Sequence, residues 1–263
     1  AMSTAYSSNA AQPGRRPAAR GRLAIWLMTN WRHLRDGWLV FRRNWLALIG
    51  MALLIMFALM ALSHPVLMQT VWKRGIYDPE TGYDLALMHP SAPGPGHLLG
   101  TDTLGRDVLS MLLAATRPTF TLAITAALTT ALISTLLGAI TAYYRGWLDQ
   151  VMAHASDAAL LVPPPLVLIV LSATLDIQPV PFGLIYGALA GISGATIVMR
   201  SHALSLVAKP YVEASRVAGA GAAHIIFRHM VPHLLPLGAT YMLISVVGAV
   251  FADGFSAFLG ISR

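Results

Sequence analysis

Long stretches without a charged side chain are the feature of this sequence that most restricts its fold. No Asp, Glu, Lys or Arg occurs between Arg43 and Lys73, and 27 uncharged residues separate Arg117 from Arg145. At about 1.5 Å per residue, a helix of about 20 apolar residues crosses the hydrocarbon core of a bilayer. Hydrophobic residues make up 56% of the 263 residues and charged residues only 11%, which is too apolar for a water-soluble domain. The sequence therefore predicts an all-α protein that crosses a membrane several times.

Five membrane spans are predicted from these charge-free stretches. They cover residues 45–62, 118–144, 158–175, 177–199 and about 234–252. The fourth span contains Gly183, Gly187 and Gly191 at four-residue spacing. Such a face of small residues favours the close approach of another helix.

The third predicted span is interrupted by Pro163, Pro164 and Pro165. Three prolines remove three backbone donors and break or kink a helix, so the freed carbonyl groups need partners in protein or water. The segment is expected to face the interior of the bundle. These prolines, together with Asp253 at the end of the fifth span, are candidate pathway or gating residues, and a purely structural kink is the alternative.

The distribution of charge predicts the orientation of the spans. Eight of the 18 Lys and Arg residues precede the first span, which places the N-terminus in the cytoplasm by the positive-inside rule. Residues 68–107 then form an external loop with five acidic and three basic residues, and residues 201–233 form a cytoplasmic loop. Before the spans, residues 1–22 are predicted to be a disordered tail and residues 23–44 a basic amphipathic helix at the lipid headgroups.

Several functional classes are disfavoured by composition and motif. The formal net charge of +7 could indicate nucleic acid, but basic residues between spans usually set orientation, and no recognition module is present. The absence of Cys excludes disulfides, thiolate metal sites and Cys nucleophiles. The sequence contains neither an HExxH motif nor a pair of carboxylates inside a span, so these signs of an enzyme are missing. No metal or cofactor site is predicted.

The cytoplasmic loop has the local signals of two short helices. Pro210 suits a first helical position, Glu213 lies in the first turn, where the helix dipole favours it, and Gly219 supplies a stop. A second helix is predicted from about Ala222 to Met230, with Pro232 closing it before the fifth span. Two such helices form a protrusion that fits the groove of a partner, and an ordinary connector on the membrane surface is the alternative.

Two motifs in the sequence carry a resemblance to a known family. The pattern EAxxxxG at Glu213, Ala214 and Gly219, followed by Pro232, resembles the EAA loop of the integral-membrane subunits of bacterial ABC importers. The sequence LGTDTLGRD at residues 99–107 resembles the signature ahead of span two in the C-type subunit of the dipeptide, oligopeptide and nickel permease branch. Its matching residues are Gly100, Thr101, Asp102, Leu104, Gly105, Arg106 and Asp107.

The sequence departs from the family pattern at four places. Ser215 stands where alanine is usual, Gly221 near the position of a usual acidic or polar residue, and Asp253 where glutamate is commoner. The family continues beyond the equivalent of Gly260 into a sixth span. We therefore expect residues 45–263 to be a permease domain whose C-terminus is incomplete.

The resemblance implies a type I ABC importer transmembrane-domain fold and a role in ATP-driven import. The implied coupling residues are Glu213, Ala214, Ser215, Gly219, Ala220, His224, Ile225, Phe227, Arg228 and Pro232. The implied partners are a homologous second permease subunit, two ATP-binding cassette subunits and an extracytoplasmic solute-binding protein, in the inner (cytoplasmic) membrane of a bacterium or archaeon. No GxxxxGK[ST] motif occurs, so ATP and Mg are expected on the partner subunits.

The implied cargo is a di- or oligopeptide, and a nickel or other metal chelate is the alternative within the family. A passive channel or secondary transporter is the alternative of another class. Such proteins usually place ionisable residues near the bilayer midplane. Asp157, Asp176 and Asp253 are predicted to lie at the ends of spans, which favours an externally driven permease.

Overall fold

The computed structural model describes residues 41–175 and 177–259. The chain divides into two compact units, Ala1–Phe57 and Ala58–Arg263, and each is described by itself. The predicted disordered tail and most of the predicted interfacial helix lie outside the described residues. All regular elements in the described ranges are helices, which confirms the predicted all-α class.

In the first unit, the described residues form a helical turn at residues 41–43 and the beginning of α2 (Trp45–Thr70), which continues into the second unit. The side-chain oxygen of Asn44 accepts a hydrogen bond from the backbone N–H of Leu46 at 3.1 Å and so caps the helix. The helix is longer than the predicted span of residues 45–62. No charged residue occurs before Lys73 to end it earlier.

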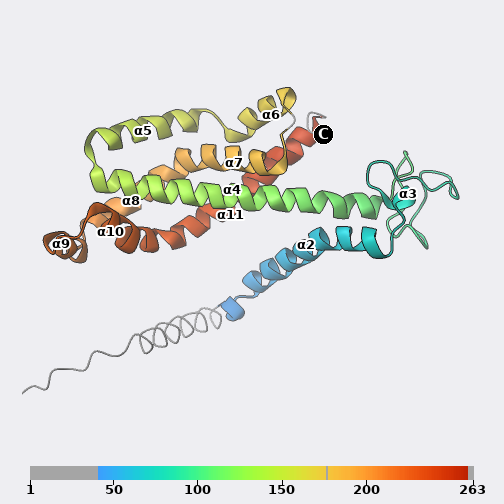
Figure 1. Cartoon of the computed structure of the whole chain (residues 1–263), viewed down its shortest axis with the longest axis horizontal. Helices are drawn as coiled ribbons and strands as arrows, with labels where there is room; N and C mark the ends of the chain where they lie inside the picture. The colour runs from blue at the N-terminus through green and yellow to red at the C-terminus, as the bar shows by residue number, and fades with distance from the viewer. Residues whose placement is uncertain (1–40, 176, 260–263) are drawn as a thin grey trace, which may run out of the picture. The chain divides into compact units, whose positions relative to one another are not determined.

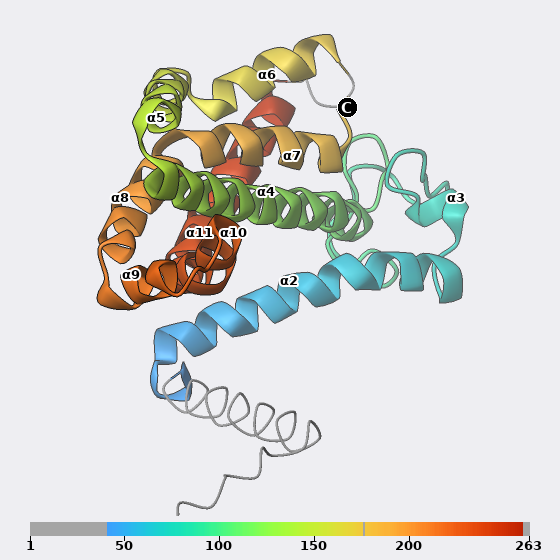
Figure 2. The ribbon, with the colours of Figure 1, turned by 60° about the vertical axis from the view of Figure 1, so that its left-hand side comes forward.

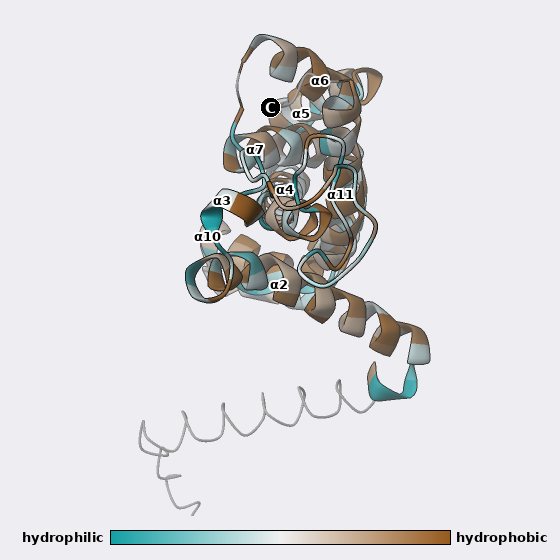
Figure 3. Ribbon diagram, turned by 90° about the vertical axis from the view of Figure 1, so that its right-hand side faces the viewer, coloured by the Kyte–Doolittle hydropathy of each residue, from teal (hydrophilic) through white to brown (hydrophobic). Residues whose placement is uncertain are grey.

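The second unit is built around α4 (Val108–Tyr144), a helix of 37 residues. It packs against α7 (Pro179–Ala190), α8 (Thr196–Val207) and α11 (Val231–Phe258), as Figures 1 and 2 show. Hydrophobic residues predominate along the long helices (Figure 3). Among the described residues, four helices are long and apolar enough to cross a membrane, and a fifth crossing is added if one bent pair counts as a span.

Glycines bring the fourth predicted span into close contact with α4. A Cβ atom added at Gly187 would lie 2.6 Å from the carbonyl oxygen of Ala126, and additions at Gly183 and Gly191 would also meet α4. The hydroxyl of Thr130 donates a hydrogen bond to the carbonyl oxygen of Gly187 at 3.2 Å. The close approach predicted from the glycine spacing is confirmed.

The third predicted span is a bent pair of helices, α5 (Gly146–Leu161) and α6 (Pro164–Thr174), which meet at an angle of 69°. The predicted start at residue 158 is wrong. Arg145 has a positive φ of 52° and reverses the chain directly after α4, so that α5 begins at once. Asp149 and Asp157 therefore lie within α5, and the prediction that Asp157 marks the end of a span is also wrong.

The three prolines separate these two helices instead of kinking one of them. Pro163 is the residue before α6, and Pro164 and Pro165 occupy its first turn. The missing N–H of a proline is tolerated there because the first backbone donors of a helix have no intrahelical acceptor.

A second irregularity joins α7 to α8. The π-helical turn η1 (Gly191–Ala195) contains Ser193 in a non-helical conformation, with φ −75° and ψ −130°. The hydroxyl of Ser156 in α5 donates to the carbonyl oxygen of Ile192 at 2.6 Å. A side chain from another helix thus binds a carbonyl group at the kink, as a break in a membrane helix requires. The helix then continues to Val207, eight residues beyond the predicted end of the fourth span at residue 199.

Two apolar clusters hold the second unit together. The first apolar cluster lies where α4, α8 and α11 meet the cytoplasmic loop predicted from the sequence. Its buried members are Ala139, Ala142, Met199, Ala203, Leu206, Val212, Ile225, Ile226, Met230 and Leu234. The second apolar cluster joins α4, α6, α7 and the far half of α11; its members are Leu122, Ala126, Leu168, Phe182, Tyr186, Ala249 and Ala252.

The loop ahead of α4, residues 71–107, contains the short helix α3 (Arg74–Tyr77) and the predicted family signature. Gly100 and Gly105 have φ values of 77° and 83°, which favour glycine. The carboxylate of Asp102 accepts from the backbone N–H groups of Leu104 and Arg106 and pairs with the Arg106 guanidinium group at 2.7 Å. The signature residues thus determine the fold of the loop.

One side chain of the signature caps α4. Asp107 is the capping residue, and its Oδ1 accepts from the backbone N–H of Ser110 at 2.7 Å. The hydroxyl of Thr101 instead accepts from the backbone N–H of Ser91 at 2.9 Å. The carboxylate of Asp102 is likewise engaged within its own turn.

His97 lies buried between two carboxylates of this loop. Its Nδ1 is 2.8 Å from Oδ2 of Asp107, and its Nε2 is 3.2 Å from Oδ2 of Asp84. Its ring also lies 5.5 Å from that of Tyr77. Because both ring nitrogens face acceptors, only the imidazolium form donates to both. Burial lowers the pKa of His97, but the hydrogen bonds to Asp107 and Asp84 outweigh it and raise the pKa above its ordinary value.

We predict opposite effects of alanine at two helical glycines. Gly187→Ala should destabilise the bundle by about 1–3 kcal/mol, since its Cβ would overlap α4. Gly254→Ala in α11 is the control, because nothing lies within 4 Å of the added atom and alanine is the better helix former. Thermal unfolding in one detergent measures both. Equal effects would contradict the role assigned to the glycine face.

The second prediction concerns the stability of the loop at residues 71–107. Because the pKa of His97 is raised in the folded protein, its imidazolium form stabilises the loop fully at pH values below the unfolded-state pKa. This stabilisation is lost as the pH rises through the folded-state pKa. Protection of the loop amides, corrected for intrinsic exchange, should therefore fall about threefold to tenfold between about pH 6 and about pH 8.5.

Hydrogen exchange read by mass spectrometry measures this change. His97→Gln should abolish the dependence on pH, because its amide does not titrate in this range. His89→Gln is the matched control: the ring of His89 bonds the Thr101 hydroxyl and the Asp84 carbonyl oxygen, and no carboxylate. An unchanged pH profile in His97→Gln would refute the assignment.

Candidate coupling surface

The first helix of the loop that the sequence predicts to be cytoplasmic is α9 (Pro210–Val217), and it has the predicted terminal residues. Pro210 occupies the first position and Glu213 the first turn. At the other end, Ala220 N–H bonds the Ser215 carbonyl oxygen, and Gly219 N–H bonds the Arg216 carbonyl oxygen, both at 3.0 Å. Gly219 has a φ of 82°. These two bonds and the left-handed glycine form a Schellman motif, which ends α9 and turns the chain.

The second predicted helix is the beginning of the last span. α10 (Ala222–Ile225), the π-helical turn η2 (Ile226–Met230) and α11 follow one another as a continuous helix, Ala222–Phe258. The prediction that Pro232 closes a separate helix is wrong. Pro232 lies in the first turn of α11, directly after the π-helical turn, so the missing N–H does not end the helix.

The inner side of these helices belongs to the first apolar cluster. Val212 of α9 is fully buried there, as are Ile225, Met230 and Leu234 of the continuous helix. Ile225 was predicted to contact a partner subunit, and this prediction is wrong. Its side chain is 0% exposed, because the helix turns it toward α4 and α8, so it is a core residue.

The outer side presents the remaining predicted residues. Seven of them are exposed and two are half-buried, and together we call these nine the coupling surface: Glu213, Ala214, Ser215, Gly219, Ala220, His224, Phe227, Arg228 and Pro232. Sequence reasoning therefore selected residues that the fold brings to one end of the bundle (Figure 1).

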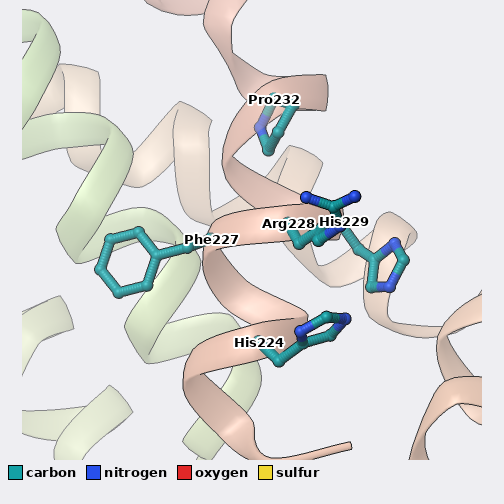
Figure 4. Close-up of a pocket in the computed structure, with 5 residues that line it drawn as sticks. All are labelled: His224, Phe227, Arg228, His229 and Pro232. Carbon is teal, nitrogen blue, oxygen red and sulfur yellow. The ribbon is translucent and has the colours of Figure 1, made fainter. Parts of the chain in front are cut away.

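An open groove of about 640 Å³ lies along the second part of this surface. It is lined by His224, Phe227, Arg228, His229 and Pro232, which Figure 4 shows on successive turns of one helix. Phe227 projects to the opposite side of the helix from the two histidines. The groove thus combines an exposed aromatic ring, a guanidinium group and two imidazoles, a composition suited to an acidic and apolar segment of another protein.

Aromatic contacts join α9 to its neighbours. The Tyr211 ring stacks with that of His233 at 5.9 Å, and it lies 6.0 Å from the His229 ring. The Arg216 guanidinium lies 5.4 Å from the ring centroid of Tyr143, at the end of α4, in a cation–π contact. Sequence reasoning missed these contacts. Their signal was the repetition of aromatic and His side chains on both helices of the loop.

No group of three His, Cys, Asp or Glu side chains within the described ranges is arranged to hold a metal ion. The rings of His224 and His229, which both line the groove, have centroids 5.5 Å apart.

The candidate pathway residues lie on two helices that pack together. The three prolines are at the α5–α6 break, and Asp253 lies partly buried in α11, which packs against α6. Their role in a pathway stays a prediction.

A polar pair that sequence reasoning missed connects α5 to α8. The guanidinium group of Arg200 donates to both carboxylate oxygens of Asp149, with Nη2 2.6 Å from Oδ2. Arg200 was interpreted as the end of a span. The available signal was a cation followed by seven further helix-forming residues, which predicts a charge inside the helix and therefore a partner.

Comparison with protein families agrees with this arrangement. The family described as "Binding-protein-dependent transport system inner membrane component" matches residues 134–262, which contain the whole coupling surface. The family described as "N-terminal TM domain of oligopeptide transport permease C" matches residues 33–89.

Curated proteins with these names align over most of the chain. The oligopeptide transport system permease protein OppC of Bacillus subtilis is 29% identical over 231 residues, which are 86% of this chain and 71% of the relative. The dipeptide transport system permease protein DppC of Haemophilus influenzae is 29% identical over 232 residues, 87% of this chain and 76% of the relative. A putative peptide permease protein of Brucella abortus is 29% identical over 221 residues, 84% of this chain and 70% of the relative.

The two family matches lie in the order that the sequence resemblance predicted, and the helical fold with its four or five candidate spans agrees with both. This multi-pass chain belongs to the integral-membrane permease subunits of binding-protein-dependent ABC importers, in the branch of the C-type oligopeptide permeases.

Proposed function

We propose that this chain forms half of the translocation pathway of an ATP-driven peptide importer and that an ATP-binding cassette subunit docks on the coupling surface. One observation carries the proposal: α9 and the start of the continuous helix are exposed on one side and buried in the first apolar cluster on the other. A displacement of the surface therefore moves α4, α8 and α11 with it, because packed interiors deform little.

The energy for transport comes from partner subunits in this proposal. The sequence has no GxxxxGK[ST] motif, so ATP and Mg bind to two ATP-binding cassette subunits. A homologous second permease subunit completes the pathway, and a solute-binding protein delivers the cargo. The coupling surface and the N-terminus then face the cytoplasm, and the loop at residues 71–107 faces the opposite side of the inner membrane.

The proposed cargo is a di- or oligopeptide, since the relatives from Bacillus subtilis and Haemophilus influenzae are named as oligopeptide and dipeptide permease proteins. A metal chelate is the alternative within the branch.

We predict that two substitutions on the coupling surface abolish ATP-coupled uptake. Glu213→Ala removes the only acidic side chain of α9. Gly219→Pro replaces a residue whose φ of 82° proline cannot adopt and removes the N–H that closes the Schellman motif. Each should lower ATP-dependent uptake into proteoliposomes by about tenfold or more, the scale of strong coupling between sites.

The control is Thr116→Ala, a half-buried residue of α4 whose hydroxyl bonds only the Leu112 carbonyl oxygen of its own helix. All variants should insert in the membrane at the wild-type level. Wild-type uptake in either coupling variant would remove the basis of the coupling assignment.

The cargo is tested on the whole complex. Mass spectrometry of the ligand held by the co-purified solute-binding protein should identify short peptides, and labelled di- and oligopeptides should compete with it for uptake. Recovery of a metal chelate, with no competition by peptides, would replace the peptide assignment.

A further inference from the structure

Two polar contacts join α5 to the bundle. Its only buried residue among those described is Ser156, whose hydroxyl bonds the Ile192 carbonyl oxygen of η1. Its other strong contact is the two-pronged ion pair from Asp149 to Arg200 of α8. The Asp149 and Arg200 side chains are 14% and 30% exposed. The helix also touches the end of α4, from which Arg145 alone separates it.

The two halves of the broken span are anchored to different parts of the molecule. α5 contacts η1 and α8, and the buried Met199 and Leu206 of α8 belong to the first apolar cluster with the inner side of the coupling surface. α6 instead contributes Leu168 to the second apolar cluster and packs against α11 and α7. Figure 2 shows the two helices diverging at the break between Leu161 and Pro164.

We infer that Asp149 and Arg200 are positioning residues that make α5 follow the coupling surface, so that movement of that surface changes the angle at the α5–α6 break. This inference rests on the proposed coupling function. An Arg–carboxylate pair with two parallel hydrogen bonds restrains orientation as well as distance, which a single bond such as that of Ser156 does not.

Besides Arg200, Arg145 directly before α5 interacts electrostatically with Asp149. Asp157 and Arg200 line the same cavity of about 160 Å³ between α5 and α8, together with Ser156, Thr196 and three apolar residues. Asp157 has no hydrogen bond or ion pair in the described part of the chain. Arg200 is therefore committed to Asp149, and Asp157 is a charge-matched control on the same helix.

The absence of native cysteine permits a direct distance measurement in the full chain. Spin labels at His154 of α5 and Val217 of α9, both exposed, report the attachment of α5 to the coupling surface. Labels at exposed Val170 of α6 and at Val217 measure a reference distance that does not involve α5. Electron paramagnetic resonance in lipid nanodiscs gives both distance distributions.

Asp149→Asn should broaden the 154–217 distribution about twofold or more, since loss of a restraint increases local opening, and leave the 170–217 distribution unchanged. Exchanging the charges, Asp149→Arg with Arg200→Asp, should restore the narrow distribution. Broadening of both distributions would show general loss of packing, and an unchanged 154–217 distribution would show that the pair does not hold α5. Either result overturns the inference.

The functional arm uses the assembled transport complex in proteoliposomes. Asp149→Asn should keep ATP hydrolysis but lower uptake per ATP hydrolysed about tenfold, within the range of coupling between protein sites. The charge exchange should restore it, and Asp157→Asn should leave it at the wild-type level. Wild-type uptake per ATP in Asp149→Asn would overturn the inference. If the wild-type complex shows no ATP-driven uptake, the proposed function fails, and the distance measurement still decides whether the ion pair holds α5.

Discussion

The hydrogen-bonding needs of the backbone constrain every irregular feature of this protein. The hydrocarbon core of a bilayer contains no water to bond the backbone groups that a broken helix leaves free. Each interruption must therefore supply hydrogen-bond partners for these groups or lie where the helix requires none. The prolines of α6 lie in its first turn, and the Ile192 carbonyl oxygen at the η1 kink receives the Ser156 hydroxyl. Pro232 follows a π-helical turn inside one continuous helix. The chain thus bends its spans only where packing and hydrogen bonds permit it.

The two apolar clusters hold different parts of the bundle together. The first apolar cluster joins the coupling surface to the ends of α4, α8 and α11, and the second holds α6 and α7 against the middle of α4 and the far half of α11. α4 belongs to both, and the glycine contacts of α7 keep its backbone close to that helix. The broken span connects the clusters along a separate route, with α5 on one side of the bend and α6 on the other.

Much of this arrangement could be predicted from the sequence because its signals are local. Apolar stretches predicted the spans, glycine spacing predicted the α4–α7 contact, and Pro210 and Gly219 predicted the ends of α9. The predictions that were wrong concern residues whose role depends on tertiary contacts. Arg200 looked like a span end because the sequence does not show its partner, Asp149, 51 positions away. Ile225 looked like a contact residue because a helix face becomes buried only through its neighbours, and Pro232 looked like a stop because a π-helical turn leaves no simple sequence signal.

The continuous helix Ala222–Phe258 also determines how far small movements reach. Its 37 residues extend over about 55 Å, whereas the hydrocarbon core is about 30 Å thick. The helix therefore extends well beyond the lipid tails, and the groove of His224 and Arg228 lies on its first turns. A tilt of about 10° around its far end displaces that groove by about 10 Å, given the rise of 1.5 Å per residue. Angular changes too small to disturb packing among the spans become displacements as large as a side chain at the end that carries the groove.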